Sequence, residues 1–107
     1  MPESFERGAL TEAVFYILLS AHEPIHGYAI MQNIEKLTCG RVMLGAGTLY
    51  GAINALVQKG WIAAAAVTAE GDSRKKEYII TGAGRAAFRS ELDRLEELLR
   101  NGKAAGK

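Results

Sequence analysis

Apolar residues recur at helical spacing in the stretch that begins at Gly45 and ends at Gly60. The repeat falls at i, i+4, i+7 and i+8, which is one stripe of an amphipathic helix. Gly45 can act as its N-cap, and Gly60 lies where a C-cap glycine would end it. The pattern predicts a helix between these two glycines, whose inward stripe consists of Leu49, Ile53, Leu56 and Val57.

The opposite face of this predicted helix carries small and uncharged polar residues instead of the usual Lys and Glu. Its members are Gly47, Thr48, Gly51, Asn54, Ala55 and Gln58. A glycine inside a helix costs roughly 1 kcal/mol relative to alanine, so Gly47 and Gly51 need an explanation. With Ala55 they form a small-residue stripe at spacing four, over which another surface can approach the backbone. That surface is either another helix, as in close packing within the fold, or a groove of nucleic acid.

Two further helices are predicted before Gly45. Leu10 to Ala21 is apolar on nearly every side, and a helix of this kind is buried on every side. In a chain of 107 residues this favours a second subunit. His26 to Leu37 is amphipathic, with Ile30, Ile34 and Leu37 inward. A tight connection then leads into the helix at Gly45, which predicts a helix-turn-helix.

A β-hairpin is predicted after the stop at Gly60. Residues 61–68 end in Val-Thr, residues 70–73 form a turn, and residues 76–81 are rich in strand-forming side chains. Arg74, Lys75 and Lys76 lie at the tip and in the second strand. A basic triplet is often only a solvated surface. Directly after a helix-turn-helix, it is also a candidate wing that contacts phosphates.

The last predicted helix begins at the N-cap Thr81 and ends at Asn101–Gly102. Apolar residues repeat in it at spacings of four, three and four, which is a narrow a/d seam. One interpretation is a helix that lies back on its own domain. A narrow seam beside an apolar first helix favours pairing with a symmetry mate instead. The expected dimer interface comprises Val14, Phe15, Leu18, Phe88, Leu92, Leu95 and Leu99.

The sequence from His22 to His26 matches the H-E-x-x-H pattern of zinc proteases. That chemistry needs both histidines on one continuous helix, and Pro24 disfavours a helix at Glu23. We therefore interpret the segment as a turn between two helices. We predict no metal site, no cofactor and no catalytic activity.

Composition limits the remaining possibilities. The chain is long enough for one small core, and its net charge of +1 means that any positive surface is local. The single cysteine, Cys39, fits a reducing compartment. No apolar run reaches ~18 residues and the N-terminus lacks the features of a signal peptide, so we expect a cytoplasmic protein without membrane contact.

Several of these segments resemble the PadR-like winged-helix transcriptional regulators. The resemblance covers residues ~10–100 and is carried by His26-Gly27-Tyr28-Ala29-Ile30, Gly47-Thr48-Leu49-Tyr50, Leu56 through Ile62, Lys76 through Thr81, and Gly84. It implies a winged helix-turn-helix with one C-terminal dimerisation helix. It also implies a homodimer that binds operator DNA and usually represses. Some such proteins release DNA on binding small aromatic or drug-like molecules.

The sequence departs from the family pattern at Gly51, where proline is common after the tyrosine. The resemblance therefore does not say which bases, if any, this position contacts.

We expect a mostly α fold with a small β-hairpin. Residues 1–80 form the winged helix-turn-helix, 81–102 the dimerisation helix and 103–107 a disordered tail. An aromatic effector would occupy an apolar gap near Phe15, Tyr16 and Phe88. The alternative function is a protein–protein interaction module without DNA binding. The expected DNA contacts are Gly47, Thr48, Tyr50, Gly51, Asn54, Gln58, Arg74, Lys75 and Lys76.

Overall fold

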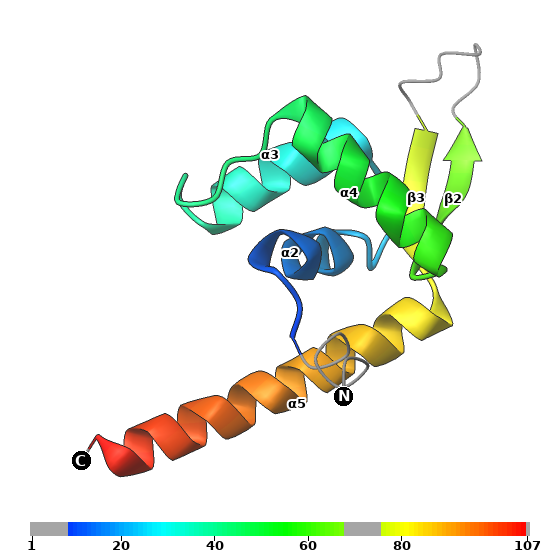
Figure 1. Ribbon diagram of the computed structural model, residues 1–107. Helices are drawn as coiled ribbons and strands as arrows, with labels where there is room; N and C mark the ends of the chain where they lie inside the picture. Colours follow the sequence, from blue (N-terminus) through cyan, green and yellow to red (C-terminus); the bar gives the residue numbers. More distant parts are fainter. Residues whose placement is uncertain (1–8, 68–75, 107) are drawn as a thin grey trace.

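The computed structural model describes residues 9–67 and 76–106 (Figure 1). Its elements confirm a mostly helical fold with a small β-hairpin. A three-stranded antiparallel sheet in the order β1-β3-β2 lies beside the helices. No helix in the described ranges is long and apolar enough to cross a membrane. In chain order the elements are α2 (Glu12–Ser20), β1 (Ile25–His26), α3 (Gly27–Leu37), α4 (Ala46–Lys59), β2 (Ile62–Val67), β3 (Lys76–Ile80) and α5 (Gly82–Ala105).

The core lies between α2, α3, α4 and the sheet. The inward positions predicted for Ile30, Ile34 and three members of the α4 stripe are confirmed, because these side chains are buried. Two predicted core residues are not buried: Leu37 is 51% exposed and Val57 is 40% exposed. Both lie in the last turn of their helices, where the neighbouring elements no longer cover the stripe. The buried core is Ile17, Leu18, Ala21, Ile30, Ile34, Leu49, Ile53, Leu56, Ile62, Tyr78, Ile80 and Phe88.

The segment after α2 contains an element that the sequence did not predict. The turn at His22 is present, but the chain then forms the two-residue strand β1, and α3 begins at Gly27 with His26 as its N-cap. In this strand Ile25 pairs with Tyr78 and His26 with Glu77. A strand of two residues is too short to show the alternation by which strands are recognised.

A close contact joins the hairpin to the last helix. Gly60 ends α4 with φ of 85°, a left-handed conformation that glycine adopts without strain. Thr81 caps α5 by accepting a hydrogen bond from the Gly84 amide. A Cβ on Gly84 would collide with the carbonyl oxygen of Trp61, so only glycine fits there.

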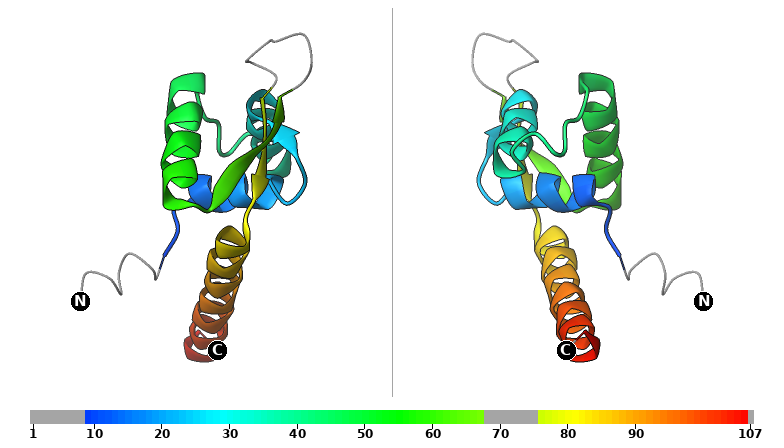
Figure 2. Two further views of the ribbon diagram at one scale, coloured as in Figure 1. Left: turned by 90° about the vertical axis from the view of Figure 1, so that its right-hand side faces the viewer. Right: turned by 90° about the vertical axis from the view of Figure 1, so that its left-hand side faces the viewer.

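Helix α5 projects from the globular body, which gives the molecule a longest dimension of 57 Å (Figures 1 and 2). Its first turns pack on α2 and β3, and the C-terminal half extends beyond them. The end predicted at Asn101–Gly102 is wrong, because the helix continues to Ala105. One glycine costs about 1 kcal/mol, and the helix formers Lys103, Ala104 and Ala105 follow it.

Candidate nucleic-acid interface

The face of α4 that the sequence predicted to point outward is exposed along its whole length, from Gly47 to Gln58. No other part of the described chain lies within 4 Å of a Cβ built on Gly47 or Gly51. Close packing within the protomer therefore does not explain these two glycines. The small-residue stripe faces open space and is free to meet a surface outside this chain.

The start of α4 and the tip side of the hairpin lie on the same side of the molecule. The N-terminal end of α4, the C-terminal end of β2 and the N-terminal end of β3 all lie away from α5 (Figures 1 and 2). Lys76 is the first residue of β3 and is exposed. Arg74 and Lys75, the other predicted wing residues, lie outside the described residues. An approaching duplex can therefore meet α4 and the start of β3 from one direction.

Tyr50 lies at the edge of the α4 face and is half-buried. Its ring covers Gly27 at the start of α3, where a Cβ would come within 2.6 Å of the Tyr50 hydroxyl oxygen. The pKa of the neighbouring Tyr78 is raised, mainly by burial and further by Tyr50. Tyr50 thus packs between α3 and α4, in addition to any contact that its hydroxyl makes outward.

The first half of the connection between α3 and α4 is fixed by side-chain contacts of Thr38 and Arg41. The Thr38 hydroxyl accepts a hydrogen bond from the Val42 amide at 3.0 Å and donates one to the Ile34 carbonyl at 2.9 Å. Arg41 forms a bidentate ion pair with Glu12 at the start of α2. The guanidinium lowers the pKa of the Glu12 carboxyl. These contacts set the position from which α4 projects its exposed face.

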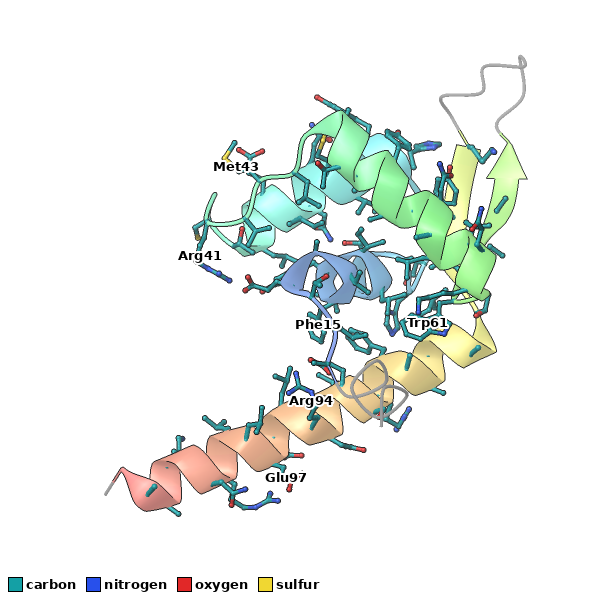
Figure 3. All side chains as sticks on the ribbon, viewed as in Figure 1. Phe15, Arg41, Met43, Trp61, Arg94 and Glu97 are labelled. Atoms are coloured by element: carbon teal, nitrogen blue, oxygen red, sulfur yellow. The ribbon has the colours of Figure 1, made fainter. Side chains whose placement is uncertain are left out.

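Five of the seven residues predicted for a dimer interface fall into two groups. Phe15 points from α2 toward α5 (Figure 3) and stacks on Phe88, with ring centroids 4.8 Å apart. The α5 leucines farther along are open: Leu92, Leu95 and Leu99 are 44%, 39% and 58% exposed.

Two of the predicted interface residues are placed elsewhere. Leu18 is 0% exposed within its own protomer, so that assignment is wrong: the side chain belongs to the core. A helix this short has only one fully covered side, and Leu18 lies on it. Val14 does not lie on the side of α2 that faces α5. It lines a pocket between α2 and α4.

The two histidines of the zinc-protease pattern do not share a helix, because His22 lies in the turn after α2 and His26 lies in β1. His22 donates from Nδ1 to the Leu18 carbonyl oxygen at the end of α2. His26 lies in β1, with Nε2 3.7 Å from a carboxylate oxygen of Glu77. Within residues 9–67 and 76–106, no group of three or more His, Cys, Asp or Glu side chains could hold a metal ion.

The three-helix body, the hairpin and the exposed face of α4 define a winged helix-turn-helix protein of the transcription-regulator class. Residues 14–90 match the Transcriptional regulator PadR-like family, and the chain belongs to this family. The family consists of DNA-binding regulators and not of enzymes. No curated protein sequence matches the chain.

Solved structures agree with this assignment. RosR from H. salinarum is 28% identical, with a TM-score of 0.64 over 92% of this chain and 96% of that chain. A PadR-family regulator from Eggerthella lenta is 25% identical, with a TM-score of 0.69 over 86% and 78%. A PadR-like transcription factor from Bacteroides fragilis, at 21% identity, shares the fold with a TM-score of 0.75 over 97% and 96%.

Proposed function

We propose that this regulator is a homodimer that represses transcription by seating α4 of each protomer in successive major grooves of an inverted-repeat operator. One observation carries the proposal: Gly47 and Gly51 lie on the exposed face of α4 with nothing of their own protomer near them. Two helix-weakening residues on an open face are accounted for if the backbone there must approach another surface closely. A dimer seated on an operator within a promoter obstructs the polymerase, which makes repression the expected outcome.

Pairing of the α5 helices supports the dimeric part of the proposal. Leu92, Leu95 and Leu99 repeat at heptad spacing on a helix that projects from the body. A contiguous apolar seam of this kind is typical of a surface that is covered in solution. We include Phe15 at the inner end of the seam. We leave out Val14, Leu18 and also Phe88, which is buried in its own protomer. Two protomers related by a twofold axis would place their α4 helices one turn of duplex apart, ~34 Å.

The test is fluorescence anisotropy with a specific duplex, selected from a random pool by the purified protein, and with a random duplex. Gly51→Glu puts a bulky anion on the small-residue stripe, and we expect it to abolish binding to both duplexes. Gly82→Glu is the matched control, because Gly82 is also an exposed helical glycine with open space around it, but lies on α5. We expect the control to bind like the wild type.

Base contacts and phosphate contacts are separated by their dependence on sequence and salt. Thr48→Ala and Asn54→Ala should weaken the specific duplex by ~1–3 kcal/mol more than the random one. Lys76→Ala, and likewise Lys75→Ala, should weaken both duplexes alike and lower the salt slope by about one. If Gly51→Glu leaves affinity and salt slope unchanged, α4 does not meet DNA. The small-residue stripe would then be a docking face for another protein.

A small aromatic or drug-like effector is the remaining part of the proposal. Phe15 stacks on Phe88, and Phe15 and Tyr16 line a pocket of about 250 Å³ between α2 and α5. This pocket supports an effector site near these aromatic residues.

A further inference from the structure

The exposed face of α4 carries no charged side chain. From Ala46 to Gln58 the helix contains no Lys, Arg, Asp or Glu. Its exposed hydrogen-bonding side chains are the Asn54 and Gln58 amides and the Thr48 hydroxyl. The solvent-facing side of an ordinary surface helix carries charged residues, so this composition is a distinct feature of α4. It limits which bases the face can read.

The two cations nearest in sequence to this face are engaged by other side chains. Lys59 is the last residue of α4 and its only charged one. Its Nζ lies 4.8 Å from the centroid of the Trp61 ring, and Trp61 lies at the end of α4 nearest to α5 (Figure 3). Arg41, in the connection that leads into α4, is paired with Glu12 at the start of α2. Neither cation is placed to enter a groove that receives the exposed face of α4.

The neutral side chains of this face match adenine and thymine. In the major groove an Asn or Gln amide forms two hydrogen bonds with one adenine, donating to N7 and accepting from the N6 amino group. Guanine is read mainly by Arg or Lys, and cytosine by Asp or Glu. Thr48 and Ala55 add methyl groups of the kind that contact the C5-methyl of thymine. The open surroundings of Gly47 and Gly51 let the backbone come close enough for these short side chains to reach base edges.

We propose that α4 reads A·T base pairs. Asn54 and Gln58 each bind one adenine. Thr48 and Ala55 contact the methyl groups of thymines. This base assignment rests on the function proposed above, since it takes α4 to lie in the major groove. The two amides are four residues apart, which is about 6 Å along the helix axis, and successive base pairs are about 3.4 Å apart. The two adenines are thus expected about two base pairs apart within each half-site.

The test exchanges each A·T pair of the selected duplex in turn for two analogues. Inosine·cytosine presents the major-groove groups of G·C with the minor groove of A·T. Diaminopurine·thymine presents the major groove of A·T with the minor groove of G·C. Fluorescence anisotropy should show two A·T pairs per half-site at which inosine·cytosine weakens binding about tenfold and diaminopurine·thymine leaves it unchanged. Deoxyuridine in place of thymidine, which removes only the C5-methyl, should weaken binding a few-fold at a neighbouring pair.

Variants of the two amides assign each pair to its residue. Asn54→Ala should abolish the preference over inosine·cytosine at one pair of each half-site and keep it at the other. Gln58→Ala should do the opposite. Asn101→Ala removes an exposed amide from α5 and is the matched control, which should keep both preferences. Asn54→Arg should change the preference to G·C at the pair that Asn54 reads.

The base assignment is overturned if inosine·cytosine binds as well as A·T at every pair, or if both alanine variants keep both preferences. Selection of a duplex with no A·T pair in its half-sites would also overturn it, and would leave the regulator itself standing. Failure of the wild type to bind any duplex would refute the proposed function and, with it, the assignment.

Discussion

The ring of Tyr50 lies directly over Gly27, so that a Cβ on Gly27 would come within 2.6 Å of the tyrosine Cε1 and hydroxyl oxygen. Gly27 is buried at the first position of α3, and Tyr50 lies in the first half of α4. Helices α3 and α4 are thus in close contact where the Tyr50 side chain packs on the backbone of Gly27. Gly27 and Tyr50 are far apart in the sequence. The structure explains why the first is glycine, because the ring of the second occupies the space that a Cβ would need.

This contact predicts that Gly27→Ala destabilises the protein by ~1–3 kcal/mol, because the tyrosine ring must move out of a packed position. The free energy of unfolding from urea denaturation measures the loss. Tyr50→Leu removes the ring, and in its background Gly27→Ala should cost much less. Additive effects of the two substitutions would show that they do not act through one contact.

Much of the body could be predicted because periodic segments with glycine and threonine caps specify their own ends. The helix from Gly45 to Gly60 and the cap at Thr81 are examples, since the physics that defines them is local. The strand β1 and the positions of Leu18 and Val14 could not be predicted. They depend on which neighbour covers each side of a short element, and that information is not local. For the same reason Leu37 and Val57 fit the helical stripe and yet lie outside the core.

The candidate site follows the same division. The exposure of the α4 face was predictable from periodicity, but the choice between internal packing and an external partner was not. It required knowledge of what surrounds Gly47 and Gly51, which only the tertiary arrangement provides. The pocket between α2 and α4 that Val14 lines left no signal in the sequence, because it arises where Ala52 and Ala55 of α4 face the start of α2.

The open surroundings of Gly51 predict that Gly51→Ala stabilises the folded protein by about 0.5–1 kcal/mol, since alanine is the better helix former and its methyl group meets nothing. The same substitution should weaken DNA binding if the backbone must approach the duplex closely. Gly84→Ala is the contrasting control, because its methyl group would collide with the Trp61 carbonyl and must destabilise. Thermal unfolding of both variants measures whether the melting temperature rises for Gly51→Ala and falls for Gly84→Ala. A lower melting temperature for Gly51→Ala would mean that the stripe is already covered, for example across a dimer.

An ion pair between a buried glutamate and a half-buried arginine on α5, beside the segment that leads into α2, predicts a pH dependence. Glu91 is 4% exposed, accepts a hydrogen bond from the Leu10 amide at 3.3 Å and pairs with Arg94 at 2.6 Å. The Arg94 guanidinium, and to a smaller extent the Leu10 amide, lower the pKa of the Glu91 carboxyl below its ordinary 4.5. The stabilisation is therefore fully present above pH 4.5 and is lost as the pH falls through the lowered pKa.

Glu91→Gln should accordingly reduce stability at pH 7 by about 1.5–3 kcal/mol, the value of a hydrogen bond to a charged group. It should also flatten the decline in stability below pH 4.5. Urea unfolding from pH 7 to pH 3 gives both quantities. Glu97→Gln is the control, because Glu97 is exposed on the side of α5 away from α2 (Figure 3) and should change neither. An unchanged acid decline in Glu91→Gln would place the titrating carboxyl elsewhere.

The exposed seam of α5 predicts the last result. Leu95 is 39% exposed in the protomer, so an aspartate there can remain solvated while the chain is monomeric. Across a paired seam the same charge would be buried without a partner, which costs several kcal/mol. Leu95→Asp should therefore give a folded monomer with a wild-type circular dichroism spectrum. Ser90→Asp adds the same charge to an exposed position on another face of α5 and should leave the dimer intact. Analytical ultracentrifugation at micromolar concentration distinguishes the two. If Leu95→Asp sediments as a dimer, the subunits do not pair through this seam, and the spacing of the α4 helices must be set by another contact.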